Sequence, residues 1–126
     1  MVTKQFEGLP ADADLTRADS LAREIFSDIA NKWALLIIGA LDERTLRFGE
    51  LRGEIDGISH KMLTQNLRML ERNGLVRRTV HPTVPPRVEY TLTDPGRALL
   101  GTVAGMCDWT QRHLGQIEAA RRDFAS

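Results

Sequence analysis

One segment of the sequence, residues 59–73, combines cations and neutral hydrogen-bonding side chains on one side of a predicted helix. Each helical residue advances about 100°, so Leu63, Leu67 and Leu70 share one face and Glu71 lies at its margin. The opposite face carries three cations, two neutral polar groups and no acid: Lys61, Thr64, Gln65, Arg68 and Arg72. Arginine and lysine can donate to guanine, glutamine can bond bidentately to adenine, and threonine offers a hydroxyl or a methyl. This mixture suits base edges in a DNA major groove, although a polar face alone is typical of any surface helix.

A second group of cations follows directly. Arg77, Arg78 and Arg87 flank a loop that runs from His81 to Pro86 and contains three prolines. The loop is too short and stiff to pack a core of its own, so we expect a projecting, positively charged tip. An arginine there can enter a minor groove or hold phosphates. The alternative is a solvated hairpin rim.

The predicted elements around these side chains form a helix-turn-helix outline. Residues 48–55 can form a two-turn helix, and residues 56–59 form a tight turn that ends in Ser59, a suitable N-cap. A longer helix then runs to about Asn73, where Gly74 is a stop signal. A short helix, a turn and a longer helix match that motif.

Further elements are predicted on both sides of this motif. Residues 75–80 and 87–92 are rich in β-branched side chains and predict a hairpin, and a last helix begins at Thr93 or Asp94 and runs nearly to the end. Towards the N-terminus, an amphipathic helix is expected from Ser20 to Ala30. The run Trp33–Leu41 is apolar on every side and predicts a helix in the middle of the core. Residues 1–19 are interpreted as a flexible or partner-docked arm.

The overall charge excludes binding to nucleic acid by bulk electrostatics. The chain has 126 residues, with 17 Lys and Arg against 17 Asp and Glu. The charges are unevenly distributed, however: residues 58–90 carry six bases and two acids, whereas residues 1–31 carry three bases and six acids. The length fits one compact domain with a small basic segment, residues 58–90, offset by an acidic N-terminal part.

Several other classes of protein are disfavoured. The longest apolar run has nine residues, whereas a membrane span needs about 20, and the N-terminus lacks a secretory signal, so we expect a cytoplasmic protein. The single Cys107 excludes an intramolecular disulfide. The three histidines (His60, His81 and His113) lie on separate elements, and no metal or phosphate-loop signature occurs. We therefore expect no enzymatic activity, no metal and no cofactor.

Several blocks of the sequence occur in the order and spacing of a known family. They are NKWALLII (31–38), RFGELR (47–52), GISHKMLT (57–64), LERNGLV (70–76) and VPPRVEY (84–90), followed by Leu92-Thr93. The chain resembles, from Ser20 to Trp109, the HxlR-type winged helix-turn-helix transcriptional regulators of bacteria and archaea.

The resemblance implies an α+β, mostly helical fold. A single domain, residues 20–126, would contain a helix-turn-helix (48–73), a wing hairpin (75–92) and terminal dimerisation helices (20–31 and 94–124). It further implies a homodimer on a palindromic double-stranded DNA operator. Two recognition helices (59–73) would occupy successive major grooves roughly 34 Å apart, and each wing (81–88) would meet the flanking minor groove or backbone.

The resemblance also assigns roles to individual residues. The implied DNA contacts are Ser59, His60, Lys61, Thr64, Gln65 and Arg68, with Arg87 in the wing and Lys32 at a phosphate. The apolar residues of the terminal helices exceed what a core of this size needs, so the dimer candidates are Leu21, Ile25, Phe26, Met106, Trp109, Leu114 and Ile117. The alternative is that these residues close a single core.

Two features qualify these expectations. Family members that sense oxidants carry a cysteine where this chain has Ser20, so the redox switch is absent from its usual place. Cys107 matches a second cysteine position, and its apolar helical stripe favours a buried structural thiol over a sensor.

A winged helix used only to bind protein is the alternative function. The polar face around Gln65 argues against it, since a docking helix more often exposes aromatics or methionine.

Overall fold

The computed structural model describes residues 12–126, with side chains from Leu15 onward. The chain divides into two compact units, residues 1–31 and 32–126. In the first unit, helix α2 spans Asp12–Ile29. It begins eight residues before the predicted Ser20, so the part of the predicted arm from residue 12 onward is helical, and the remainder of the arm lies outside the described residues. The helix extends because apolar residues continue towards the N-terminus at spacings of three and four, at positions 15, 18, 22, 25 and 29, without glycine or proline.

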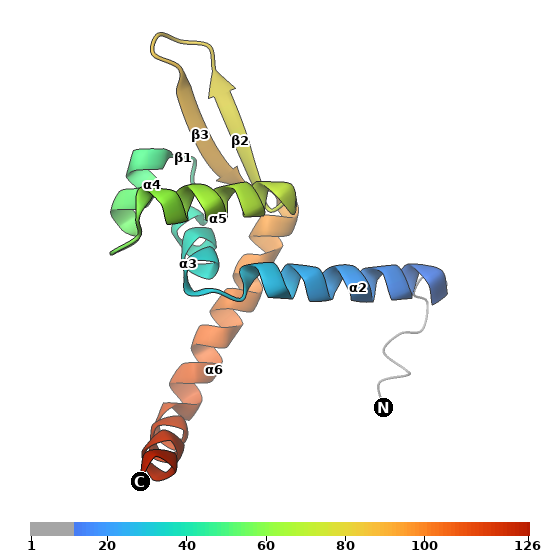
Figure 1. Cartoon of the computed structure of the whole chain (residues 1–126), viewed down its shortest axis with the longest axis vertical. Helices are drawn as coiled ribbons and strands as arrows, with labels where there is room; N and C mark the ends of the chain where they lie inside the picture. The colour runs from blue at the N-terminus through green and yellow to red at the C-terminus, as the bar shows by residue number, and fades with distance from the viewer. Residues whose placement is uncertain (1–11) are drawn as a thin grey trace. The chain divides into compact units, whose positions relative to one another are not determined.

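The second unit is a winged helix-turn-helix fold (Figure 1). Its elements, in chain order, are α3 (Lys32–Leu41), β1 (Leu46–Arg47), α4 (Phe48–Glu54), α5 (His60–Arg72), β2 (Val76–His81), β3 (Arg87–Leu92) and α6 (Asp94–Ala125). The predicted helix-turn-helix, hairpin and long last helix are all confirmed. In the described part of the chain, no helix is both long enough and apolar enough to span a bilayer.

Helix α3 supplies the centre of the core. Its residues Ala34, Ile37, Ile38 and Leu41 are fully buried. The predicted position in the core is confirmed, but Leu36 is 53% exposed, so this helix is not buried on every side although it is apolar on every side. The buried positions repeat at spacings of three and four, and they therefore occupy one face of this ten-residue helix.

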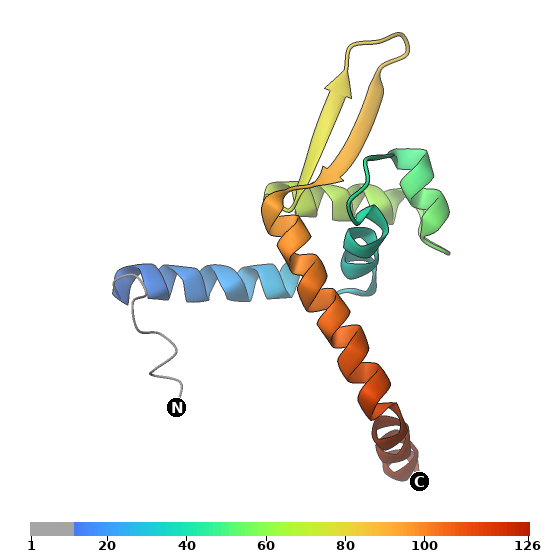
Figure 2. The same ribbon diagram turned by 180° about the vertical axis from the view of Figure 1, so that it is seen from behind.

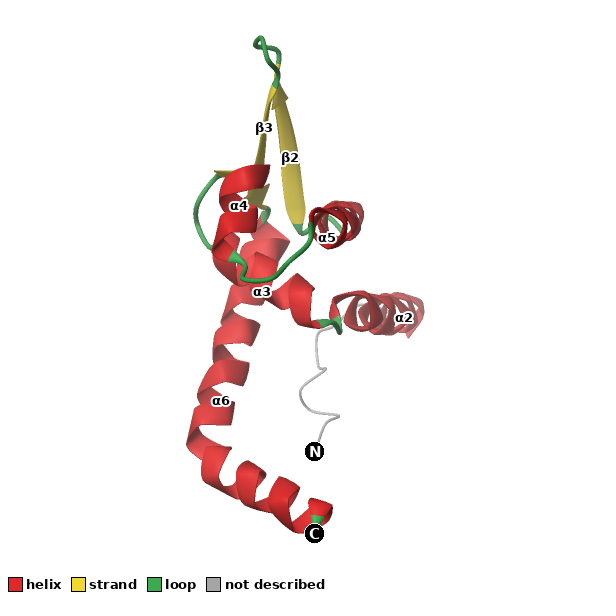
Figure 3. Cartoon of the chain, turned by 60° about the vertical axis from the view of Figure 1, so that its left-hand side comes forward, coloured by secondary structure: helices red, strands yellow, loops and turns green. Residues whose placement is uncertain are grey.

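The sheet has three antiparallel strands in the order β1-β3-β2. Strand β1 was not predicted, because two residues are too few to show a period of two. Paired residues share a face of the sheet, so the pairs Val76–Leu92 and Leu46–Tyr90 lie on the inner face, and Val76, Leu92 and Leu46 are buried there. The outer face contains polar pairs instead. Figure 3 shows the β2–β3 hairpin, here called the wing, extending beyond α4 and α5.

Helix α6 is anchored to the base of the wing. The Thr93 hydroxyl accepts a hydrogen bond from the Gly96 amide (3.2 Å) and donates one to the Gly74 carbonyl (2.5 Å). Gly96 packs so closely on Leu75 that a Cβ atom at position 96 would overlap the Leu75 carbonyl oxygen. The start of α6 is therefore fixed relative to the end of α5.

The C-terminal half of α6 extends away from the wing and from α3, α4 and α5 (Figure 2). Most side chains beyond Leu100 are exposed. Cys107 is among them, so the predicted buried thiol is wrong. The apolar stripe that suggested burial is present, but no element of residues 32–126 packs over it.

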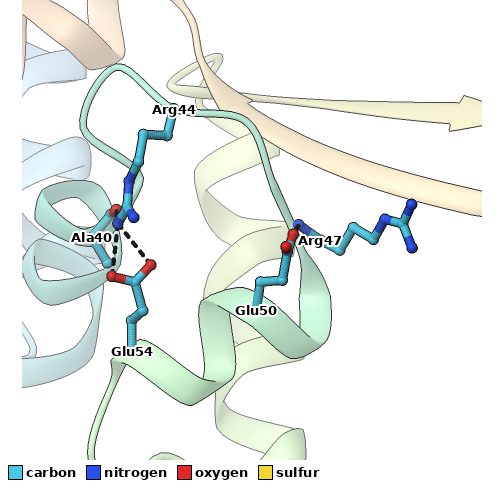
Figure 4. A network of polar contacts seen from close by, with 5 residues as sticks. All are labelled: Ala40, Arg44, Arg47, Glu50 and Glu54. Carbon is cyan, nitrogen blue, oxygen red and sulfur yellow. Dashed lines mark hydrogen bonds and ion pairs between the residues drawn. The ribbon is translucent and has the colours of Figure 1, made fainter.

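A polar clip joins α3 to α4 (Figure 4). One terminal nitrogen of Arg44 donates to the Ala40 carbonyl (2.5 Å) and to both carboxylate oxygens of Glu54 (2.8 and 2.7 Å). The hydrogen bond to Glu54 raises the pKa of Arg44 above its ordinary value. In the same turn, Glu50 accepts a hydrogen bond from the Arg47 amide (2.8 Å), which satisfies a free donor at the start of α4.

Candidate nucleic-acid interface

Helix α5 has one buried face and one exposed face, and local interactions fix its rotation. The Ser59 hydroxyl caps the helix by accepting from the Met62 amide (3.0 Å). Leu63, Leu67 and Leu70 are at most 2% exposed. Asn66 is also buried, and its amide donates to the Met62 carbonyl (2.9 Å), so no buried donor of this side chain is lost. The opposite face must therefore point outward.

That exposed face carries the predicted cations. Lys61, Gln65, Arg68 and Arg72 are all exposed. Neither Lys61 nor Arg68 forms an ion pair with any residue in the described range. Their charges are thus available to an external anion, and Gln65 lies between them with a donor and an acceptor.

His60 and Thr64 lie on the same helix, beside a cleft that Arg68 also lines. The Thr64 hydroxyl donates to the His60 carbonyl (2.8 Å), and the His60 ring lies 4.6 Å from the Phe48 ring, centroid to centroid. Both residues line a cleft of about 360 Å³ between α5 and the inner face of the sheet, here called the α5 cleft. Its walls are Phe48, His60, Thr64, Leu67, Arg68, Glu71, Arg78 and Tyr90.

The back of the α5 cleft is polar. Arg78 of β2 forms an ion pair with Glu71 of α5 (3.5 Å). Beside them, burial raises the pKa of Tyr90 above its ordinary value of 10, and the positive charge of Arg78 partly offsets this shift. Glu71 is thus directed towards the wing, which leaves the cationic face of α5 without an acid.

The wing forms a second cleft of about 460 Å³ with the start of α4, here called the wing cleft. It is lined by Arg47, Phe48, Gly49 and residues 83–88. Arg87 is 40% exposed at its side chain, and its Nε atom lies 3.7 Å from Glu89 Oε2. Arg47 is an exposed cation in this cleft that the sequence analysis did not select, because the only signal was its place in an unpredicted two-residue strand.

The structure brings most of the predicted DNA contacts together and leaves one apart. Six lie on or just before α5 (Ser59, His60, Lys61, Thr64, Gln65 and Arg68), and Arg87 lies in the adjacent wing. Lys32 is separate from them: it lines neither cleft, and its ammonium lies 4.5 Å from the centre of the Trp33 ring.

The predicted dimer residues are also placed. On α2, Leu21 and Phe26 are 55% and 66% exposed, and Ile25 is half-buried. On α6, Met106, Trp109 and Leu114 are about half exposed, and Ile117 is half-buried. Large apolar side chains exposed along a helix are typical of a surface that another molecule covers.

The HxlR-like helix-turn-helix family matches residues 28–118, which include every element from α3 to β3 and most of α6. The chain belongs to this family. One relative, the uncharacterised HTH-type transcriptional regulator YtfH of Escherichia coli K12, is 41% identical over 105 residues, which is 83% of either chain.

Solved structures agree with this assignment. The putative transcriptional regulator ytfH from Salmonella typhimurium is 40% identical, with a TM-score of 0.69 over 80% of this chain and 90% of that one. The reduced form of the transcriptional regulator YodB from B. subtilis is 39% identical, with a TM-score of 0.65 over 71% and 88% of the two chains. The protein is therefore an HxlR-like member of the helix-turn-helix transcriptional regulators.

Proposed function

We propose that this HxlR-like protein binds double-stranded DNA sequence-specifically as a homodimer. The observation that carries the proposal is the exposed, acid-free face of α5, where Lys61, Gln65 and Arg68 lie together. Among the described residues, neither Lys61 nor Arg68 has an ion-pair partner. These groups match the donors and acceptors of base edges in the major groove. Helix α5, with its cap at Ser59, is the proposed recognition helix.

Phosphate contacts are proposed around this helix. The Ser59 hydroxyl uses a lone pair as the cap, so its hydrogen stays available to a phosphate oxygen, and the positive end of the helix dipole favours the same anion. His60 and Thr64, at the edge of the α5 cleft, would contact the phosphates of the adjacent DNA strand. Arg87, together with Arg47 across the wing cleft, would hold the backbone or enter the flanking minor groove. Lys32 is a proposed phosphate contact outside this group.

The homodimer is proposed from the apolar residues of the terminal helices. Trp109 and Met106 on α6, and Phe26 and Leu21 on α2, expose large apolar surfaces that a second copy would cover. Ile25, Leu114 and Ile117 complete this set. Two-fold symmetry would present two α5 helices to successive major grooves, and the operator would share that symmetry.

Selection from a random duplex library tests the proposal. The purified protein should enrich duplexes with two inverted half-sites whose centres lie about one helical turn, roughly 34 Å, apart. The variant Arg68→Ala serves as the matched comparison and should enrich a less defined half-site. No enrichment of any duplex, with a folded protein, would contradict the proposal and favour a winged helix that binds protein instead.

A further inference from the structure

The basic segment, residues 58–90, contains only two acids, Glu71 and Glu89, and each contacts an arginine of the wing. An acid on a surface that binds phosphates ordinarily weakens binding, because it repels the backbone. Glu71 fits this simple expectation, since it forms one long ion pair with Arg78 at the margin of α5. Glu89 differs from Glu71 because its carboxylate contacts two residues, His81 and Arg87.

Glu89 divides its two carboxylate oxygens between two partners. Oε1 lies 2.6 Å from His81 Nε2, and Oε2 lies 3.7 Å from Arg87 Nε. Because an ionised carboxylate only accepts hydrogen bonds, His81 Nε2 carries the proton in this contact. The Glu89 side chain is 27% exposed, less than either partner at 34% and 40%.

The strand register explains why both partners are reached. His81 and Arg87 form the last pair of the β2–β3 ladder before the loop of residues 82–86. Glu89 is two residues along the same strand from Arg87, and alternate residues of a strand share a face. The carboxylate therefore holds both ends of the loop from the outer face of the sheet.

Arg87 shows the consequence of this contact. Its Nε atom is buried and forms no hydrogen bond with a described residue, and its nearest acid is Glu89. The side chain is nevertheless 40% exposed, so its other atoms carry the exposure. The inner nitrogen of the guanidinium thus lies buried beside the Glu89 carboxylate, and the Arg87 side chain lines the wing cleft.

We propose that Glu89 is a positioning residue for the wing: it orients the Arg87 guanidinium towards a phosphate and ties His81 to the same place. The proposal rests on the proposed DNA-binding function. It assigns to Glu89 a favourable effect on DNA binding, opposite in sign to that of an acid acting through charge alone. An ordered guanidinium loses less side-chain entropy when it binds.

Glu71→Gln is the matched control for Glu89→Gln, because both remove one negative charge from the basic segment. Fluorescence anisotropy on a selected duplex and on a scrambled duplex, at one salt concentration, should show Glu71→Gln binding both duplexes more tightly. Glu89→Gln should bind both more weakly, by about two- to fivefold, which is the size of one exposed ion pair. Tighter binding by Glu89→Gln, to the same extent as Glu71→Gln, would overturn the proposal.

A double-mutant cycle shows whether Glu89 acts through Arg87. In the Arg87→Ala background, Glu89→Gln should no longer weaken binding and should instead strengthen it slightly, because only the repulsion then remains. An equal loss in both backgrounds would also overturn the proposal. If Glu89→Gln does not fold, Glu89→Asp replaces it: this variant keeps the charge but shortens the reach, and it should also weaken binding.

A measurement without DNA separates this proposal from the proposed function. The Arg87 Nε–H signal in a ¹⁵N NMR spectrum of the folded protein should report a more ordered side chain in the wild type than in Glu89→Gln, and no such change in Glu71→Gln. If the wild type bound no duplex, the proposed function would fail, while this comparison would still decide whether Glu89 orders Arg87. Equal order in all three proteins would overturn the positioning role.

Discussion

Glu71 of α5 and Arg78 of β2 form an ion pair between the proposed recognition helix and the wing, with 3.5 Å between Oε2 and Nε. Their side chains are 40% and 46% exposed, so the pair contributes little to the free energy of unfolding. The ion pair instead directs the negative charge of Glu71 towards the wing. The acid is paired with Arg78 in the α5 cleft, whereas Lys61 and Arg68 form no ion pair with a described residue.

The tyrosine beside this pair gives a prediction on pH. Burial raises the pKa of Tyr90 above 10, whereas the unfolded chain keeps the ordinary value. The folded state therefore keeps the Tyr90 proton at a pH at which the unfolded chain has lost it. The contribution of Tyr90 to the free energy of unfolding is fully present below pH 10 and is lost as the pH rises from 10 through the folded-state pKa. Tyr90 is the only tyrosine, so tyrosinate absorbance near 295 nm reports it directly. Arg78→Ala should raise its pKa further, and a wild-type midpoint at or below 10 would contradict this account.

Gly96→Ala should destabilise the fold. A Cβ at this position overlaps the Leu75 carbonyl oxygen, so α6 must move away from the base of the wing, at a cost of about 1–3 kcal/mol in the free energy of unfolding. Gly101→Ala on the same helix is the control, because nothing lies within 4 Å of the new atom. Its helix propensity should stabilise the protein by up to about 1 kcal/mol. Urea denaturation measures both, and equal effects of the two changes would argue against the close contact.

The DNA-binding side chains should divide into two classes. Gln65→Ala and Arg68→Ala remove proposed base contacts. Each should therefore reduce the difference in binding free energy between a selected and a scrambled duplex by about 1–3 kcal/mol. Arg87→Ala removes a proposed phosphate contact and should weaken binding to selected and scrambled duplexes alike. Anisotropy titrations on both duplexes distinguish the classes. Uniform losses in all three variants would show that α5 and the wing do not have separate roles.

Trp109→Glu should convert a dimer into monomers, because it places a charge in the proposed apolar interface on α6. Gln111→Glu adds the same charge two residues away, on another side of the helix, and should leave the dimer intact. Sedimentation velocity at micromolar concentration measures the mass of each protein. A monomeric wild type, or dissociation by both variants, would count against this interface.

The sequence predicted the central elements well because their signals are local. The turn at Gly57, the cap at Ser59 and the stop at Gly74 define the ends of α5, and the prolines between residues 81 and 87 define the wing. The spacing of Leu63, Leu67 and Leu70 correctly predicted which face of α5 is buried.

The differences between prediction and structure arise from interactions that no local pattern records. Strand β1 forms because Leu46 and Arg47 meet the edge of β3, far along the chain. The exposure of Leu36 and Cys107 depends on which neighbours pack on α3 and α6, whereas an apolar stripe shows only that burial is favourable. The contacts of Glu89 with His81 and Arg87 depend on the register of the wing, which its composition does not specify.

The salt dependence of duplex binding tests the central claim most directly. Each phosphate that the α5 face and the wing neutralise should contribute about 0.9 to the slope of log K against log salt concentration. We expect tight binding of a selected duplex at low salt and a steep, linear loss as salt rises, with a shallower slope for Arg87→Ala. Binding that does not change with salt, or no binding to any duplex at low salt, would contradict the account.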